Sequence, residues 1–250
     1  MNAPKLFTKM DISGNSYAVN RKVNFDRIGI FKPTTVISVF KFAYDMTFGA
    51  KGEHRHSRSG GSYFRNNLEI FSNTFQGKLS EFALANLFFK HKGFNAPDLS
   101  THSLGVWEDV DFLIGKSVIA VKSTKSYGNL LLLEKKDWDF QGHYLASTGT
   151  PRIYTHLVLV RISPDSDEIT RQLRTDHSDN ELENLLKSKI INREWSYDIP
   201  GFIETQDLQI VIREGNIIPK GARLNDSVTM DADNYYVQAG DLRNVKFLKI

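Results

Sequence analysis

The chain has 250 residues, 24% charged and 40% hydrophobic, with 32 Lys and Arg against 29 Asp and Glu. This length predicts one large domain or two small ones, and a composition near the globular average excludes disordered, collagen-like and coiled-coil proteins. With no cysteine, no apolar run of the roughly 18–20 residues that cross a membrane and no secretory signal, we expect a cytoplasmic protein without disulfides, thiolate metal sites or thiol catalysis.

Residues 1–33 are irregular, and the first regular element is predicted at 34–48, where apolar residues recur every three or four positions. Thr34 or Thr35 is the expected N-cap. A loop rich in glycine and basic residues follows at 51–65, where Glu53 is the single acid. Such a loop is suited to contact a phosphate backbone, although a solvated surface loop is the alternative. The predicted DNA-binding residues of this loop are Lys51, Arg55, Arg58 and Arg65.

The rest of the chain alternates between helical and strand patterns. A second helix is predicted from about Asn67 to His91, then a β-hairpin with strands 106–114 and 117–123, a buried strand at 154–163 and a helix at 178–190. The last sixty residues form short segments. We therefore predict one α/β domain, a mixed central sheet flanked by helices. Its parts are an N-terminal helix and basic loop (1–66), a core (67–163) and a C-terminal extension (164–250).

The predicted hairpin brings polar residues together. If Gly115 and Lys116 form a two-residue turn, Ile114 pairs with Ser117 and Asp111 lies opposite Ala120. Strand alternation then places Asp109, Asp111, Ala120 and Lys122 on one face of the sheet. Val110, Phe112, Ile119 and Val121 form the opposite face, toward the core. A simple cross-strand ion pair between Asp109 and Lys122 is the structural alternative.

An Asp followed by an acid two residues before a Lys on the next strand is the catalytic pattern of the PD-(D/E)XK nucleases, which this chain resembles. The resemblance is closest to the type II restriction endonucleases and covers residues 77–125, about a fifth of the chain. It lies in 109-DVDF-112, in 120-AVKSTK-125 and in 77-GKLSE-81 on the preceding helix. It implies a restriction-endonuclease-like fold and Mg²⁺, or Mn²⁺ in its place, as cofactor.

The resemblance also assigns roles to these residues. It implies that Asp111 and the acid at 120 bind Mg²⁺ together with the Val121 backbone carbonyl. It implies that Lys122 orients or deprotonates the attacking water and stabilises negative charge. Position 120 is Ala120, however, and its methyl group can neither bind a metal nor accept a proton. Either the acid has moved to Glu81, or the protein is naturally inactive, or an inactivating substitution stands at 120. The intact surroundings favour the last.

Glu81 is the candidate additional carboxylate, because Gly77 and Ala85 lie one helical turn before and after it and leave room for a sheet. An exposed glutamate near Lys78 is the alternative. Ser123, Thr124 and Lys125 follow Lys122 directly and could donate to DNA phosphates.

The function predicted from these residues is Mg²⁺-dependent, sequence-specific cleavage of double-stranded DNA in a prokaryotic cell. Duplex DNA has two strands of opposite polarity, so we expect a homodimer in which each subunit cuts one strand. Two alternatives remain: a catalytically dead nuclease fold that binds DNA, and a repair or recombination nuclease that recognises DNA structure.

Overall fold

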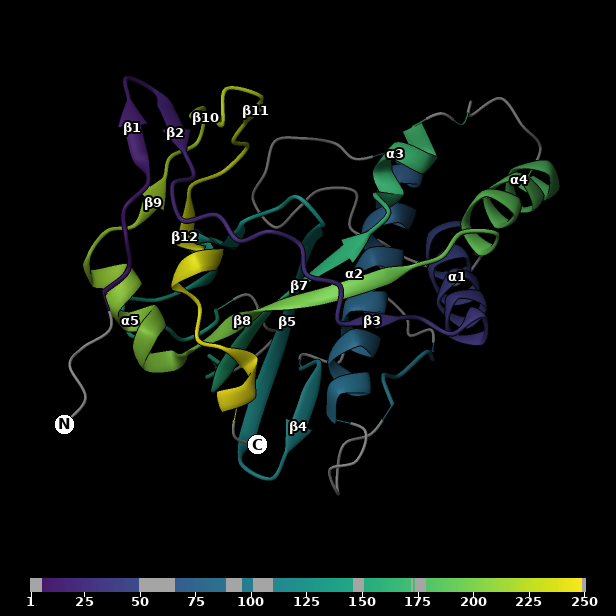
Figure 1. Ribbon diagram of the computed structural model, residues 1–250, viewed down its shortest axis with the longest axis horizontal. Helices are drawn as coiled ribbons and strands as arrows, with labels where there is room; N and C mark the ends of the chain where they lie inside the picture. The colour runs from purple at the N-terminus through teal and green to yellow at the C-terminus, as the bar shows by residue number, and fades with distance from the viewer. Residues whose placement is uncertain are drawn as a thin grey trace.

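The computed structural model describes residues 6–49, 66–88, 96–100, 110–145, 151–171, 173 and 179–248 (Figure 1). It is a mixed α/β protein, as predicted. No helix in these ranges is long and apolar enough to cross a membrane. The predicted basic loop, with Lys51, Arg55, Arg58 and Arg65, lies outside the described residues, as does Asp109.

A five-stranded mixed sheet forms the centre of the molecule. Its order is β3 (Gly29–Ile30), β8 (Ser196–Glu204), β7 (His156–Ser163), β5 (Ser117–Lys125) and β4 (Phe112–Ile114). Only β5 and β7 run parallel, and the other neighbours are antiparallel. The middle strand β7 is buried at every residue except Ser163, because layers cover both faces of the sheet.

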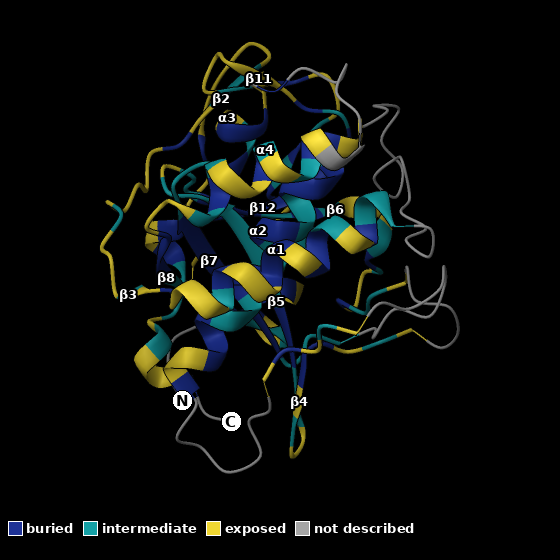
Figure 2. Cartoon of the chain, turned by 90° about the vertical axis from the view of Figure 1, so that its right-hand side faces the viewer, coloured by how far each residue is buried: buried dark blue, intermediate teal, exposed yellow. Residues whose placement is uncertain are grey.

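Four helices cover one face of this sheet: α1 (Pro33–Phe48), α2 (Asn67–Phe88), α3 (Ser166–Arg171) and α4 (Asp179–Ile191). Figure 2 views this layer from outside, where α1 and α4 show exposed residues in yellow. Their inner faces join the sheet in a large apolar cluster whose most deeply buried members include Phe71, Phe75, Leu79 and Ile119. Burial of this cluster is the main force that holds the layer in place.

The helix boundaries follow from local chemistry. Helix α1 starts at Pro33, because proline fits the first turn of a helix, where its missing N–H is not needed. Its N-cap is Lys32, so the predicted N-cap at Thr34 or Thr35 is wrong, and both threonines lie inside the helix. Helix α2 is capped by a reciprocal pair: Asn66 Oδ1 accepts from the Glu69 amide, and Glu69 Oε2 accepts from the Asn66 amide. It is described up to Phe88, so the predicted end at His91 lies outside the described residues.

The opposite face is covered by a second sheet and one helix. The sheet has the order β6 (Leu130–Glu134), β12 (Asn234–Gln238), β9 (Ile217–Ile218), and α5 (Thr205–Arg213) packs beside it. The predicted mixed sheet flanked by helices is therefore found with four helices on one face, and with α5 beside a second sheet on the other. A second apolar cluster fills the interface and includes Leu131, Leu133, Leu157 and Leu208.

A third, four-stranded sheet lies at the upper left in Figure 1, away from α1 and α4. Its order is β1 (Asp11–Ser13), β2 (Ser16–Ala18), β10 (Arg223–Leu224) and β11 (Val228–Thr229), so both ends of the chain contribute to it. The Met10 amide donates to the Tyr236 hydroxyl at 3.0 Å. Three short 3-10 helices, η1 (Lys135–Asp137), η2 (Ala239–Asp241) and η3 (Val245–Phe247), complete the described elements.

Candidate functional site

The β4–β5 hairpin has the predicted register. Phe112 pairs with Ile119 and Ile114 with Ser117 around a turn in which Gly115 has φ 59°, a value that favours glycine. In the described residues β4 begins at Phe112, two residues after the first described position, and residues 106–109 of the predicted strand lie outside the described residues. Asp111, just before β4, holds the strands together: its Oδ2 accepts a hydrogen bond from the Val121 amide at 2.6 Å.

The two faces of the hairpin strand β5 point into different environments. Ile119 belongs to the cluster beneath the helices, as predicted. Ala120 lies on the other face, is 3% exposed and belongs to the cluster with Leu133 and Trp138. A carboxylate at position 120 would therefore be buried among apolar side chains, which is energetically unfavourable. The alanine matches its surroundings, which argues against the interpretation that it replaced an acid.

A cleft of about 650 Å³ runs beside β5. Residues 121–125 form one wall together with α2, and β6 and the segment after it form the other. Within the part of the chain that the structure describes, no hydrogen bond or ion pair engages the Lys122 ammonium. An unpaired cation in a cleft is available to an anionic ligand. The charged residues that line the cleft are Lys122, Lys125, Glu134, Asp137 and Asp167.

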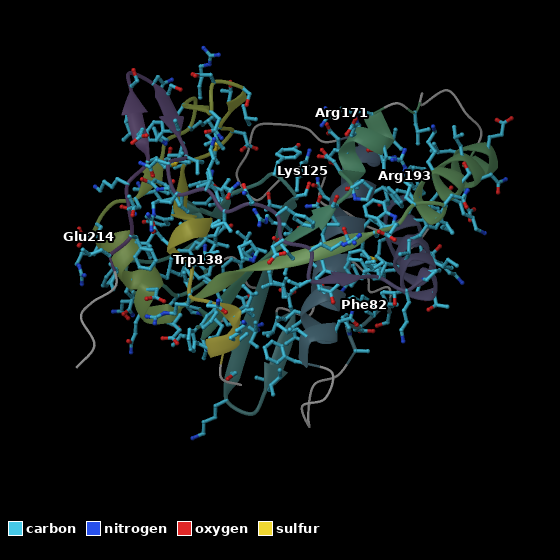
Figure 3. The ribbon with its side chains drawn as sticks, in the orientation of Figure 1. Phe82, Lys125, Trp138, Arg171, Arg193 and Glu214 are labelled. Atoms are coloured by element: carbon cyan, nitrogen blue, oxygen red, sulfur yellow. The ribbon has the colours of Figure 1, made fainter. Side chains whose placement is uncertain are left out.

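Lys125 is already paired with protein carboxylates. Its Nζ lies 3.0 Å from Asp165 Oδ2 and 2.8 Å from Asp167 Oδ2. Ser72 donates to Asp167, and the Tyr127 hydroxyl donates to Asp165 at 3.1 Å. Figure 3 shows Lys125 beside the start of α3, with Trp138 on the side of the molecule where β12 lies. A lysine held in this way is a poor phosphate donor, which disfavours the predicted DNA contact.

The pKa values in this cluster reflect its contacts. Burial lowers the pKa of Lys125, but hydrogen bonds and charge from Asp167 and Asp165 outweigh burial, and the pKa is raised overall. Burial raises the pKa of Asp167, but hydrogen bonds from Lys125 and Ser72 outweigh it, so the pKa of this carboxyl lies below its ordinary value. Both groups are therefore stabilised in their charged forms.

The other two predicted DNA donors also line the cleft. Ser123 Oγ accepts a hydrogen bond from Gln76 Nε2 at 3.3 Å, which ties β5 to α2. Thr124 packs closely against Gly128, where a larger residue would collide with its side chain. Contact of either residue with DNA stays a prediction.

Glu81 lies on another side of α2. Its Oε2 is 2.7 Å from Lys78 Nζ, and this ammonium stands over the Phe42 ring of α1. At 100° per residue, Glu81 is rotated by about 140° from Gln76, the residue that reaches β5. Gly77 marks no close approach of the sheet, since a side chain there would meet nothing within 4 Å. This arrangement favours the alternative of a helix glutamate paired with Lys78.

The metal ligands implied by the resemblance fit this site poorly. Asp111 accepts from the Val121 amide, the Ala120 side chain offers no ligand atom, and Glu81 is paired toward α1. Only the Val121 carbonyl is expected near Asp111, since the N–H and C=O of a strand residue point to the same side. Across the described ranges, no group of three or more His, Cys, Asp or Glu side chains could hold a metal ion.

Three acids of the cleft were not predicted from the sequence: Glu134, Asp137 and Asp167. Glu134 follows the leucine run of β6 directly and Asp137 lies three residues further on, and acids at the end of a buried strand were a detectable signal. Asp167 could not be found in this way, because it is brought to Lys125 by the tertiary contact of α3 with β5. In comparisons with protein-family models, curated proteins and solved structures, nothing matched the chain.

Proposed function

We propose that this protein is an endonuclease of the restriction type, which hydrolyses phosphodiester bonds in double-stranded DNA and has a restriction-endonuclease-like fold. One observation supports this most: Lys122 lines a cleft, its ammonium has no partner among the described residues, and the amide of the adjacent Val121 donates to Asp111. A strand-borne lysine with an aspartate just before the paired strand is the part of the predicted pattern that supports the proposal.

In this function Lys122 is the group that meets the substrate. Its ammonium would bind the scissile phosphate and stabilise the negative charge that develops on it. Asp111 positions Val121 and so sets the direction in which Lys122 leaves the strand. Mg²⁺, or Mn²⁺ in its place, is the proposed cofactor. Because the implied ligands fit poorly, we assign no step to the metal here.

A second candidate function is DNA binding without hydrolysis. The burial of Ala120 in an apolar cluster favours it, because the position where the pattern requires an acid is built for a methyl group. Both candidates share duplex DNA as partner and a homodimer as the functional form.

Digestion of plasmid DNA with Mg²⁺ or Mn²⁺ tests the proposal. The unmodified chain should cut, and Lys122→Ala should cut at least about a hundredfold more slowly, a barrier change of about 2.7 kcal/mol. Lys116→Ala is the matched control, because Lys116 is an exposed lysine in the turn of the same hairpin. Binding without cutting by the unmodified chain would establish the second candidate, and neither binding nor cutting would overturn both.

A further inference from the structure

Three carboxamide side chains line the cleft together with Lys122, and the proposed function does not yet use them. They are Asn73 and Gln76 of α2 and Asn234 of β12. We propose that this cleft binds a single nucleotide with its base out of the stack, the phosphate on Lys122 and the edge of the base on the carboxamides. The inference rests on the proposed function for the source of the nucleotide, which is a strand of the DNA substrate.

Two of these carboxamides are almost fully buried and yet keep one atom open to the cleft. Gln76 is 9% exposed, and its Nε2 donates to Ser123 Oγ at 3.3 Å. Asn234 is 6% exposed, and its Nδ2 donates to the Ala232 carbonyl at 2.8 Å. Among the described residues, neither side-chain oxygen has a hydrogen-bond partner, and the Asn73 side chain has none at either end.

These open oxygens indicate a ligand. Neither the Gln76 nor the Asn234 oxygen is sealed inside the protein, so both are accessible from the cleft. Buried polar groups in folded proteins are normally hydrogen-bonded, and a group that is not requires an explanation. A ligand that donates hydrogen bonds in the cleft supplies one.

The cleft is open because β5 extends beyond β4. The two strands pair only up to Ile119, and no strand of the described chain continues the pairing along residues 121–125. The Val121 amide points to this open edge, since it donates to Asp111, and by alternation the N–H and C=O of Ser123 point there too. Helix α2 approaches the edge from one layer and β12 from the other. A ligand at this edge therefore meets groups from both layers.

The lining matches the two parts of a nucleotide. Leu132, Trp138 and Met230 supply apolar surface against which the faces of a base can pack. Carboxamides present a donor and an acceptor side by side, as the edge of a base does. Lys122 supplies a cation for the phosphate. The volume of about 650 Å³ also lies within the roughly 300–1,000 Å³ that is typical of small-ligand sites.

The charge of the lining favours one phosphate over many. Three acids and two lysines line the cleft. Lys125 is paired with Asp167 at 2.8 Å, which leaves Lys122 as the cation available to a ligand among the described lining residues. A polyphosphate or a continuous stretch of DNA backbone needs more positive charge than this. An uncharged base with a single phosphate does not.

The test measures the binding of single nucleotides to the full chain. The four deoxynucleoside 5′-monophosphates and inorganic phosphate are titrated separately and followed by isothermal titration calorimetry. We expect at least one nucleotide to bind about tenfold or more tightly than inorganic phosphate, because only the nucleotide reaches the carboxamides. Lys122→Ala should weaken the binding of both.

Two variants test the carboxamides. Asn73→Ala breaks no side-chain hydrogen bond among the described residues, and Gln76→Leu keeps a side chain of similar size. Each should lower the affinity for that nucleotide about fivefold, the effect of one hydrogen bond, and leave the affinity for inorganic phosphate unchanged. Asn184→Ala is the control, because it removes an exposed carboxamide of α4 that lies outside the cleft. Thermal unfolding of each variant confirms that it is folded.

A duplex oligonucleotide with 2-aminopurine in a single mismatch tests the source of the nucleotide. The fluorescence of this base rises when it leaves the stack, and a mismatched base is the least costly to unstack. We expect a rise on saturation with the unmodified chain, and a smaller rise with Gln76→Leu. Nucleotide binding in the cleft without any rise overturns the DNA strand as the source and indicates a free nucleotide.

The outcomes separate this inference from the proposed function. Equal affinity for nucleotides and inorganic phosphate overturns the inference, as does nucleotide affinity that is unchanged in both Asn73→Ala and Gln76→Leu. Plasmid cleavage that depends on Lys122 would leave the nuclease function standing in either case. Nucleotide binding that depends on the carboxamides, without plasmid cleavage by the unmodified chain, supports the nucleotide site and rejects the nuclease function.

Discussion

Position 120 shows how a single methyl group can decide between interpretations of a sequence. Ala120 faces Leu133, Trp138 and Leu157 in an apolar cluster. We predict that Ala120→Asp lowers the free energy of unfolding by about 2 kcal/mol or more, because the new carboxylate loses its hydration without gaining a partner. The melting temperature should fall by about 2–4 °C for each kcal/mol.

Circular dichroism during heating at pH 7 measures this effect. Ala18→Asp is the control, since Ala18 is exposed at the end of β2 and should tolerate the charge. Plasmid cleavage should not increase. An unchanged melting temperature together with a roughly thousandfold gain in cleavage would instead show that position 120 lost an acid.

The Lys125 cluster predicts a pH dependence of stability. The pKa of Asp167 in the folded chain is below its usual value of 3.8, so its contribution to stability is complete above about pH 4 and is lost as pH falls through the lowered pKa. Asp167→Asn should therefore destabilise the protein by about 2 kcal/mol at pH 7, since charge-assisted hydrogen bonds are lost.

The measurement is the difference in melting temperature between the unmodified chain and Asp167→Asn from pH 7 to pH 3. This difference in melting temperature should become smaller toward pH 3. Glu168→Gln, an exposed neighbour on α3, should show no such dependence. A difference that stays constant over this range would mean that the Asp167 carboxylate does not stabilise the fold through its charge.

Among the elements, the β4–β5 hairpin is held at its open end by the hydrogen bond from the Val121 amide to the Asp111 side chain. Asp111→Ala removes the acceptor for the Val121 amide, and we predict at least about tenfold faster hydrogen exchange at Val121, because a hydrogen bond to a charged group contributes about 1.5–3 kcal/mol. Asp111→Asn keeps an oxygen acceptor and should preserve much of the protection. Hydrogen exchange followed by NMR distinguishes the two variants. If the Val121 amide is protected equally in Asp111→Ala and in the unmodified chain, the carboxylate does not hold the strands.

The hairpin and the helices α1, α2 and α4 were predictable because their determinants are local, whereas the short helices α3 and α5 were not predicted. A two-residue turn with glycine fixes the register, and apolar spacing fixes α1 and α4 to within a residue. The three-stranded sheet was not predictable, since β6 pairs with β12 about a hundred residues later and nothing in either segment specifies the other. The residues of the cleft were likewise predictable only where local sequence determines their position. Lys122 was found from its strand, whereas Asp167 and the β6 acids reach the cleft through tertiary packing.

At the scale of the whole molecule, the cleft lies where separate layers meet. The parallel β5–β7 connection carries β6 away from the central sheet and into a second sheet with the C-terminal β12. The cleft is consequently lined by both strand systems and by α2. The charged residues that line the cleft are two lysines and three acids, so the cleft carries no excess of positive charge. They are Lys122, Lys125, Glu134, Asp137 and Asp167. Most of the charge that attracts a DNA backbone would have to come from elsewhere on the protein.

The basic segment at 51–65 is the sequence's main source of such charge, and it gives the last prediction. Arg55→Ala and Arg58→Ala together should weaken duplex binding and reduce the slope of log affinity against log salt by roughly one unit per lost phosphate contact. Fluorescence anisotropy between low and moderate salt measures both quantities. Lys41→Ala/Lys187→Ala removes two exposed cations from α1 and α4 and should leave the slope unchanged.

An unchanged slope in the arginine variant would show that this segment does not contact DNA. Loss of affinity for one sequence only, with non-specific binding retained, would show that these arginines contact bases rather than phosphates.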